Sequence, residues 1–150
     1  MRPWLQSAAI VFLLSSIALA ASEPLPALKA RADAAHGGEQ AKLCLEYAHR
    51  ILEDANALFT SGDVEKAQHE VDEVVEYGRK AADAASSSGK HLKQTEIDLR
   101  KLSKRLHDIA ATLAVEDRPP LQKAVEDLEQ IRSDLLARMF GPQAEPKGKP

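Results

Sequence analysis

A seven-residue leucine repeat in the second half of the chain restricts the possible folds more than any other feature. Within residues 90–115 the repeat fills two alternating helical positions, with one threonine among apolar side chains (Leu92, Leu99, Leu106 and Leu113; Thr95, Leu102 and Ile109). This spacing predicts an α-helix with a single apolar stripe. At ~1.5 Å per residue the helix would be about 39 Å long. Such a helix is not stable alone in water, so we expect other helices to cover its stripe.

Three more segments show helical periodicity, over residues 39–60, 64–85 and 121–139. Each places its apolar side chains on one face (Cys44, Ala48, Ile51, Ala55 and Leu58; Val64, Ala67, Val71, Val74, Val75, Gly78 and Ala82; Leu121, Ala124, Val125, Leu128, Ile131, Leu135 and Met139). Gly78 weakens its helix by about 1 kcal/mol, which favours a role in close helix packing.

The connections between these segments are short and contain helix-ending residues. Gly62 is suited to a helix C-terminus and Asp63 to the next N-cap, Ser86–Gly89 predicts a brief turn, and the Asp117 and Pro119 region is the clearest boundary. Short connections favour antiparallel neighbours. No segment alternates with the two-residue period of a strand. We therefore predict an all-α protein with an antiparallel, up-down-up-down helical bundle of about four helices over residues 39–140.

Residues 1–20 have the features of a secretory signal peptide. Arg2 supplies a positive start, residues 8–20 are uncharged and apolar, and Ala18-Leu19-Ala20 fits a small-x-small cleavage site. The apolar run is shorter than the roughly 20 residues that span a bilayer. A retained anchor and a buried core helix are the alternatives. We expect cleavage near Ala21.

The mature chain is therefore expected to be exported by a Sec-type route, to the periplasm or beyond the cell, with no stable membrane insertion. Residues 21–38 contain almost no large apolar side chains and predict a flexible or marginally helical lead-in. Residues 141–150 are expected to form a disordered tail.

The turn between the first two predicted helices resembles one tetratricopeptide-type helical hairpin. The matching residues include the stretch GDVEKA (Ile51, Ala55, Leu58, Gly62, Asp63, Ala67, Val71 and Val74). The resemblance covers about a third of the mature chain, and the residues after it do not fit a second copy. It implies a helical hairpin and no more.

Composition and motifs argue against several functional classes. The full chain has 20 Lys and Arg against 23 Asp and Glu, so nucleic acid is not an expected partner. The single cysteine, Cys44, falls on an apolar helix face, where a thiol is usually inert. Phosphate-binding loops and the common hydrolase and redox motifs are missing from the sequence. We predict neither an enzyme nor a cofactor or metal site.

Two patterns nevertheless have the residue types of metal ligands. Glu46 and His49 have Glu-x-x-His spacing, but together with Glu53 they fall opposite the Cys44 stripe, which predicts a solvated face. A second line, with two further acidic neighbours, lies on the outer face of the next helix (Glu65, His69, Glu73 and Glu76; Glu70 and Asp72). It could bind a divalent ion weakly. The i, i+4 spacing of Glu76 and Lys80 favours a salt-bridged surface instead.

Charge is divided unevenly along the chain. Residues 33–85 contain 12 acidic and 5 basic side chains, whereas residues 90–110 contain 6 basic and 3 acidic ones. Two interpretations follow: the basic helix pairs with the acidic hairpin across their seams, or the acidic face binds a basic protein partner.

The leading hypothesis is an exported, non-enzymatic helical module with an interaction or structural role in the cell envelope, either monomeric or homodimeric. The alternative is a metal- or stress-responsive periplasmic binding protein that uses the acidic and histidine line.

Overall fold

A computed structural model describes residues 22–141, which form α-helices joined by short connections and contain no strand. The five α-helices are α1 (Leu25–Ala34), α2 (Gly37–Ser61), α3 (Val64–Ser88), α4 (Leu92–Thr112) and α5 (Pro119–Phe140), with a short 3₁₀ helix, η1 (Val115–Asp117), before α5. The predicted all-α class is confirmed, with one helix more than the sequence predicts. The expected signal peptide and residues 142–150 of the expected tail lie outside the described residues.

The turn between α2 and α3 forms where the sequence predicts it. Gly62 has φ 87°, the left-handed conformation that glycine adopts without steric cost, and its N–H donates to the carbonyls of Leu58 and Phe59. The backbone N–H of Asp63 donates to the Leu58 carbonyl at 2.9 Å. Asp63 is the N-cap residue of α3, as the sequence predicts, although its side chain makes no cap hydrogen bond.

The leucine-repeat helix is shorter than predicted, because α4 ends at Thr112 and Leu113 is extended (φ −86°, ψ 159°). Its stripe nevertheless faces inward. The five central side chains of the repeat are at most 2% exposed (Thr95, Leu99, Leu102, Leu106 and Ile109). Leu92 and Leu113, at its ends, are half-buried.

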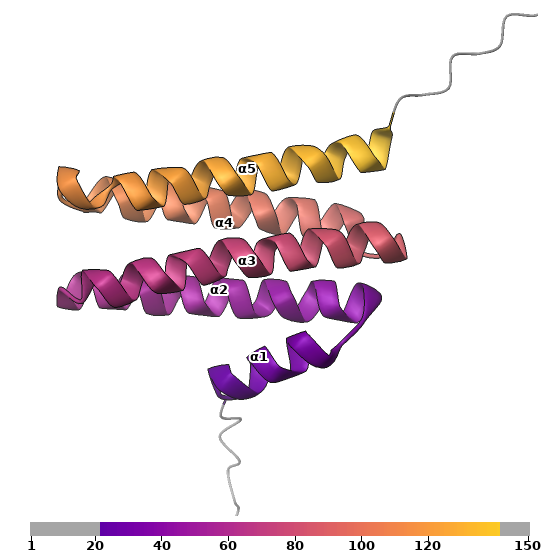
Figure 1. Cartoon of the computed structure of the whole chain (residues 1–150), viewed down its shortest axis with the longest axis horizontal. Coiled ribbons are helices and arrows are strands. Elements are labelled where there is room, and N and C mark those ends of the chain that lie inside the picture. Colours follow the sequence, from indigo (N-terminus) through magenta and orange to yellow (C-terminus); the bar gives the residue numbers. More distant parts are fainter. Residues whose placement is uncertain (1–21, 142–150) are drawn as a thin grey trace, which may run out of the picture.

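The helices form two antiparallel hairpins, α2–α3 and α4–α5, that lie side by side (Figure 1). Chain direction alternates from helix to helix, as the sequence predicts. Across the hairpins, however, α2 packs beside α4 and α3 beside α5. These neighbours run parallel, because Gly38 lies against His91 and Glu53 binds Arg105 farther along the same two helices. Consequently α3 contacts α5 more extensively than it contacts α4, its successor in the chain.

Gly78 lies where α3 packs against α4 and α5. A Cβ atom there would lie 2.9 Å from Leu128 Cδ2 and 3.3 Å from Leu99 Cδ2. Both leucines are fully buried. The interpretation of Gly78 as a close-packing residue is therefore confirmed, with α4 and α5 as the neighbouring helices.

Helix α1 lies in the segment predicted to be a flexible or marginally helical lead-in. Figure 1 shows it against the α2–α3 hairpin, at the opposite edge of the molecule from α5. Leu28 and Ala32 are fully buried in the main core. Helix propensity alone would leave ten residues marginal, so tertiary contacts with the hairpin account for this ordered helix.

Candidate functional site

A cluster of two tyrosines and charged side chains joins α1 to the α2–α3 hairpin. The rings of Tyr47 on α2 and Tyr77 on α3 are tilted by 57°, with centroids 4.5 Å apart. The Tyr47 hydroxyl donates to one oxygen of Glu73, and Lys29 Nζ lies 3.0 Å from the other. Lys29 Nζ also lies 5.8 Å from both ring centroids. We call Lys29, Asp33, Tyr47, Glu73, Tyr77 and Lys80 the α1 cluster.

Asp33 forms the second half of the α1 cluster. The Tyr77 hydroxyl lies 2.9 Å from each Asp33 oxygen, and Lys80 Nζ lies 3.1 Å from one of them. Burial alone would raise the pKa of Asp33, but the hydrogen bonds from Tyr77 and Lys80 lower it. Burial and the neighbouring carboxylate raise the pKa of Tyr77. A phenol with a raised pKa stays protonated at neutral pH, so the cluster anchors α1 and supplies no nucleophile.

The same side of the hairpin opens into a groove near the α2–α3 turn. The α2–α3 groove has a volume of about 490 Å³ and is lined by Asp54, Ala57, Leu58, Ser61, Lys66 and Glu70. Glu70 Oε2 is buried without a hydrogen-bond partner. Burial, Asp54 and Glu73 raise the pKa of Glu70. The groove therefore combines apolar side chains with a carboxylate that lacks a partner for one of its oxygens.

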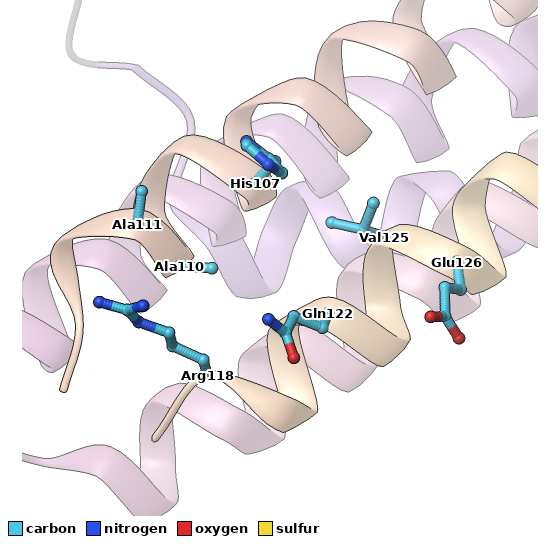
Figure 2. A pocket seen from close by; sticks show the side chains of 7 residues that line it. All are labelled: His107, Ala110, Ala111, Arg118, Gln122, Val125 and Glu126. Atoms are coloured by element: carbon cyan, nitrogen blue, oxygen red, sulfur yellow. The ribbon is translucent and has the colours of Figure 1, made fainter. Parts of the chain in front are cut away.

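A second depression, of about 450 Å³, lies between the end of α4 and the start of α5 (Figure 2). Ala110, Ala111 and Val125 are its apolar lining, and the remaining four side chains are polar (His107, Arg118, Gln122 and Glu126). Arg118 Nε donates to the Leu113 carbonyl at 3.0 Å, which holds this side chain to the α4–α5 connection. The lining contains no serine, threonine or cysteine beside His107, so this depression has no nucleophile–base pair.

A third pocket, of about 240 Å³, lies on the seam between α2 and α4, with His49 and Asp98 among its lining residues. His49 Nε2 lies 3.7 Å from Asp98 Oδ1. Burial lowers the pKa of His49 more than Asp98 raises it. Thr95 also lines the pocket, is fully buried and has no partner for Oγ1.

The sequence places Glu46, His49 and Glu53 on a solvated face, and the structure corrects this for His49. Glu46 and Glu53 are exposed, and Glu53 accepts two hydrogen bonds from Arg105, at 2.8 and 2.9 Å. His49 is instead half-buried beside α4. The reason is that α2 contacts α3, α4 and α1, so only part of its polar side reaches solvent.

The acidic and histidine line on α3 is divided by its contacts. Glu73 belongs to the α1 cluster, Glu76 lies 3.1 Å from Lys80, and Glu65, His69 and Asp72 are exposed. No group of three or more His, Cys, Asp or Glu residues within residues 22–141 could hold a metal ion. Of the two metal-ligand patterns in the sequence, neither is assembled into a site in this part of the chain.

Cys44 is fully buried, and burial raises its pKa to about 11. A thiol with this pKa is almost entirely protonated at neutral pH and is a poor nucleophile. The structure thus places Cys44 in the core, on the apolar face where the sequence predicts it.

Pairing between the basic α4 helix and the acidic hairpin is limited. Arg105 is the one Lys or Arg of α4 that forms an ion pair with α2 or α3 within the described residues, through Glu53. Lys101 and Lys104 pair with carboxylates of α4 itself. Much of the acidity of the hairpin is therefore not neutralised by α4.

Sequence reasoning misses the α1 cluster and the distinct position of Glu70. Tyr47 and Tyr77 lie at the edge of their helical stripes, and Lys29 and Asp33 have i, i+4 spacing in the lead-in. These positions could have suggested that the lead-in docks on the hairpin. The sequence contains no signal that separates Glu70 from its acidic neighbours.

No helix in the described part of the chain is long and apolar enough to cross a membrane. Comparisons with protein-family models, curated proteins and solved structures found no match to the chain.

Proposed function

We propose that this chain is an exported, non-enzymatic helical module of the cell envelope that binds a basic protein partner through its α2–α3 hairpin. One observation carries the proposal. Six carboxylates of the hairpin have no Lys, Arg or His side chain within 4.0 Å among residues 22–141 (Glu39, Glu46, Asp54, Glu65, Glu70 and Asp72). These unpaired charges attract a cationic surface and steer its approach.

Export is the second part of the proposal. It rests on the charge, apolar run and cleavage pattern of residues 1–20. N-terminal sequencing of the chain recovered from the envelope fraction is expected to give a start near Ala21. Recovery of an intact Met1 from a cytoplasmic fraction would contradict it.

The binding proposal is tested with a defined cationic probe. A fluorescent decalysine peptide is titrated with the chain at about 0.05 M and 0.5 M salt, because screening weakens exposed charge interactions over this range. Binding is expected at low salt and should weaken steeply at high salt. Undiminished binding at high salt, or no binding at low salt, would overturn the proposal.

A matched pair of variants locates the interaction on the hairpin. The double variant Glu65→Gln/Asp72→Asn is expected to weaken decalysine binding. The control Glu116→Gln/Glu126→Gln removes the same charge on the α4–α5 side of the molecule, where both carboxylates are also exposed. Equal loss of binding in the two variants would mean that net charge, and not the hairpin, determines binding.

A further inference from the structure

We infer that the α2–α3 groove binds a short amphipathic helix of the partner protein, with a lysine of that helix bound to Glu70. This inference rests on the proposed function and specifies the partner's chemistry. Three features of the hairpin support it: the way α1 already binds there, the length of hairpin that α1 leaves open, and the environment of Glu70.

Helix α1 shows how a helix binds this side of the hairpin. Leu28 and Ala32, one helical turn apart, are fully buried in the shared core. Lys29, next to Leu28 in the chain, reaches over the hairpin to Glu73 on α3 with a 3.0 Å contact. The binding mode thus combines an apolar stripe with one lysine directed at an α3 carboxylate.

Helix α1 is too short to cover the whole hairpin. Its 10 residues extend for about 15 Å, whereas the 25 residues of α2 extend for about 37 Å. Lys29 forms an ion pair with Glu73, and Asp33, later in α1, forms one with Lys80, later in α3. The start of α1 therefore points toward the α2–α3 turn. The side chain of Glu23, just before α1, does not extend toward the α2–α3 turn, because its carboxylate pairs with Arg31 of α1.

The part of the hairpin that α1 does not cover contains the α2–α3 groove. Glu70 lies one helical turn before Glu73 on α3, closer to the α2–α3 turn. Its Oε2 atom is buried without a partner, and Asp54 beside it has no cation within 4.0 Å among the described residues. Lys66 lies at the rim, 3.8 Å from Asp63.

A bound lysine would correct an unfavourable arrangement. A buried carboxylate oxygen without a hydrogen bond loses hydration and gains nothing in return. An ammonium group in the groove would bind the other, accessible oxygen of Glu70 and stabilise the charge of the same carboxylate, as Lys29 does for Glu73. Ala57 and half-buried Leu58 supply apolar surface for the stripe of the incoming helix.

The test uses a synthetic helical peptide that copies the spacing of α1. It carries leucines at i and i+3, lysine at i+4 and alanine at i+7, repeated twice, as do Leu25, Leu28, Lys29 and Ala32. A scrambled peptide has the same composition and charge. Binding of both to the chain is measured by fluorescence anisotropy, and decalysine is titrated in parallel.

The patterned peptide is expected to bind more tightly than the scrambled one. Glu70→Gln should weaken its binding by about tenfold or more, because the substitution removes the charge that the lysine meets. Asp54→Asn should weaken it less. The control Glu65→Gln removes an exposed α3 carboxylate outside the groove. It lowers the attraction for any cationic peptide, so it should weaken binding of the patterned and scrambled peptides equally, by about twofold or less. Far-UV circular dichroism confirms that each variant is folded.

The outcomes separate this inference from the proposed function. Equal binding of the patterned and scrambled peptides, or equal effects of Glu70→Gln and Glu65→Gln, would overturn the inference that a helix binds in the groove. The proposed binding to a general acidic surface would remain. Binding of decalysine without binding of the patterned peptide would have the same meaning. Failure of all three peptides would overturn both proposals.

Discussion

Two glutamates one turn apart on α3 show how position changes the behaviour of the same side chain. For Glu73, burial would raise the pKa, but hydrogen bonds from Tyr47 and Lys29 lower it. For Glu70, burial raises the pKa and Asp54 and Glu73 raise it further. Glu73 is thus stabilised as a carboxylate, whereas Glu70 has a buried oxygen without a partner. Tyr47 on α2 and Lys29 on α1 together make this difference.

At the residue scale, Leu106 tests whether the leucine repeat forms the core. Leu106 is fully buried, so Leu106→Ala should lower the free energy of unfolding by about 2–5 kcal/mol. Urea denaturation followed by circular dichroism measures the change. The control Lys104→Ala, whose side chain is 79% exposed, should change stability by no more than about 0.5 kcal/mol. A loss below that value for Leu106→Ala would contradict a buried stripe.

At the element scale, α1 depends on its tertiary contacts. It has only ten residues, its first turn contains Pro26, and its N-cap, Pro24, makes no side-chain hydrogen bond. A helix this short is marginal alone, so its order derives from Leu28, Ala32 and the α1 cluster. Arg31 and Glu23 add an exposed ion pair, which contributes little to stability in water.

We therefore expect α1 to respond to loss of a single core side chain. Leu28→Ala should speed amide hydrogen exchange across residues 25–34, while protection of α4 and α5 stays unchanged, because α1 does not pack extensively on either helix. Exchange followed by mass spectrometry measures both regions. Ala30→Ser, at an exposed position of α1, is the matched control. Equal protection of α1 in Leu28→Ala and the unsubstituted chain would contradict this dependence.

At the scale of the whole molecule, ionised side chains connect elements that are distant in sequence. Glu53 joins α2 to α4 through Arg105, Glu73 joins α3 to α1 through Lys29, and Asp33 joins α1 to α3 through Tyr77 and Lys80. The pKa of each of these three carboxyls is lowered in the folded chain. Glu73, whose side chain is 17% exposed, should matter most, because solvent screens the more exposed pairs.

These pKa shifts predict a loss of stability in acid. A lowered carboxyl pKa adds stability above the ordinary value of 4.5 for Glu73, and this stability is lost as pH falls through the folded pKa. His49 acts in the same direction at higher pH, because its lowered pKa means that the unfolded chain takes up a proton first, near pH 6.5. Glu70 has the opposite effect. Its pKa is raised in the folded chain, so its protonation stabilises the folded state as pH falls.

The expected net result is a midpoint of thermal unfolding that falls as pH is lowered from 7 to 4. Each kcal/mol lost from the free energy of unfolding should lower it by about 4–8 °C. Differential scanning calorimetry at constant ionic strength measures it. In Glu73→Gln the decline below pH 5 should be shallower than in the unsubstituted chain, whereas Glu65→Gln should leave the slope unchanged. A midpoint that is constant or rises toward pH 4 would contradict the assignment.

The sequence by itself determined the local structure of this protein. Helical periodicity identified four of the helices, the leucine repeat identified the buried side of α4, and Gly62 identified the turn between α2 and α3. These features depend on side chains within a few residues of one another, so a single sequence contains the necessary information.

Only the tertiary structure decided which helices face each other and which charges are satisfied. Periodicity shows that a helix has an apolar face, but it does not show which helix covers that face. The parallel packing of α2 with α4, the ordering of α1, and the contrast between Glu70 and Glu73 all depend on contacts between residues far apart in the chain. The candidate groove belongs to this second category, because it lies beyond the first residue of α1, where the hairpin continues toward its turn.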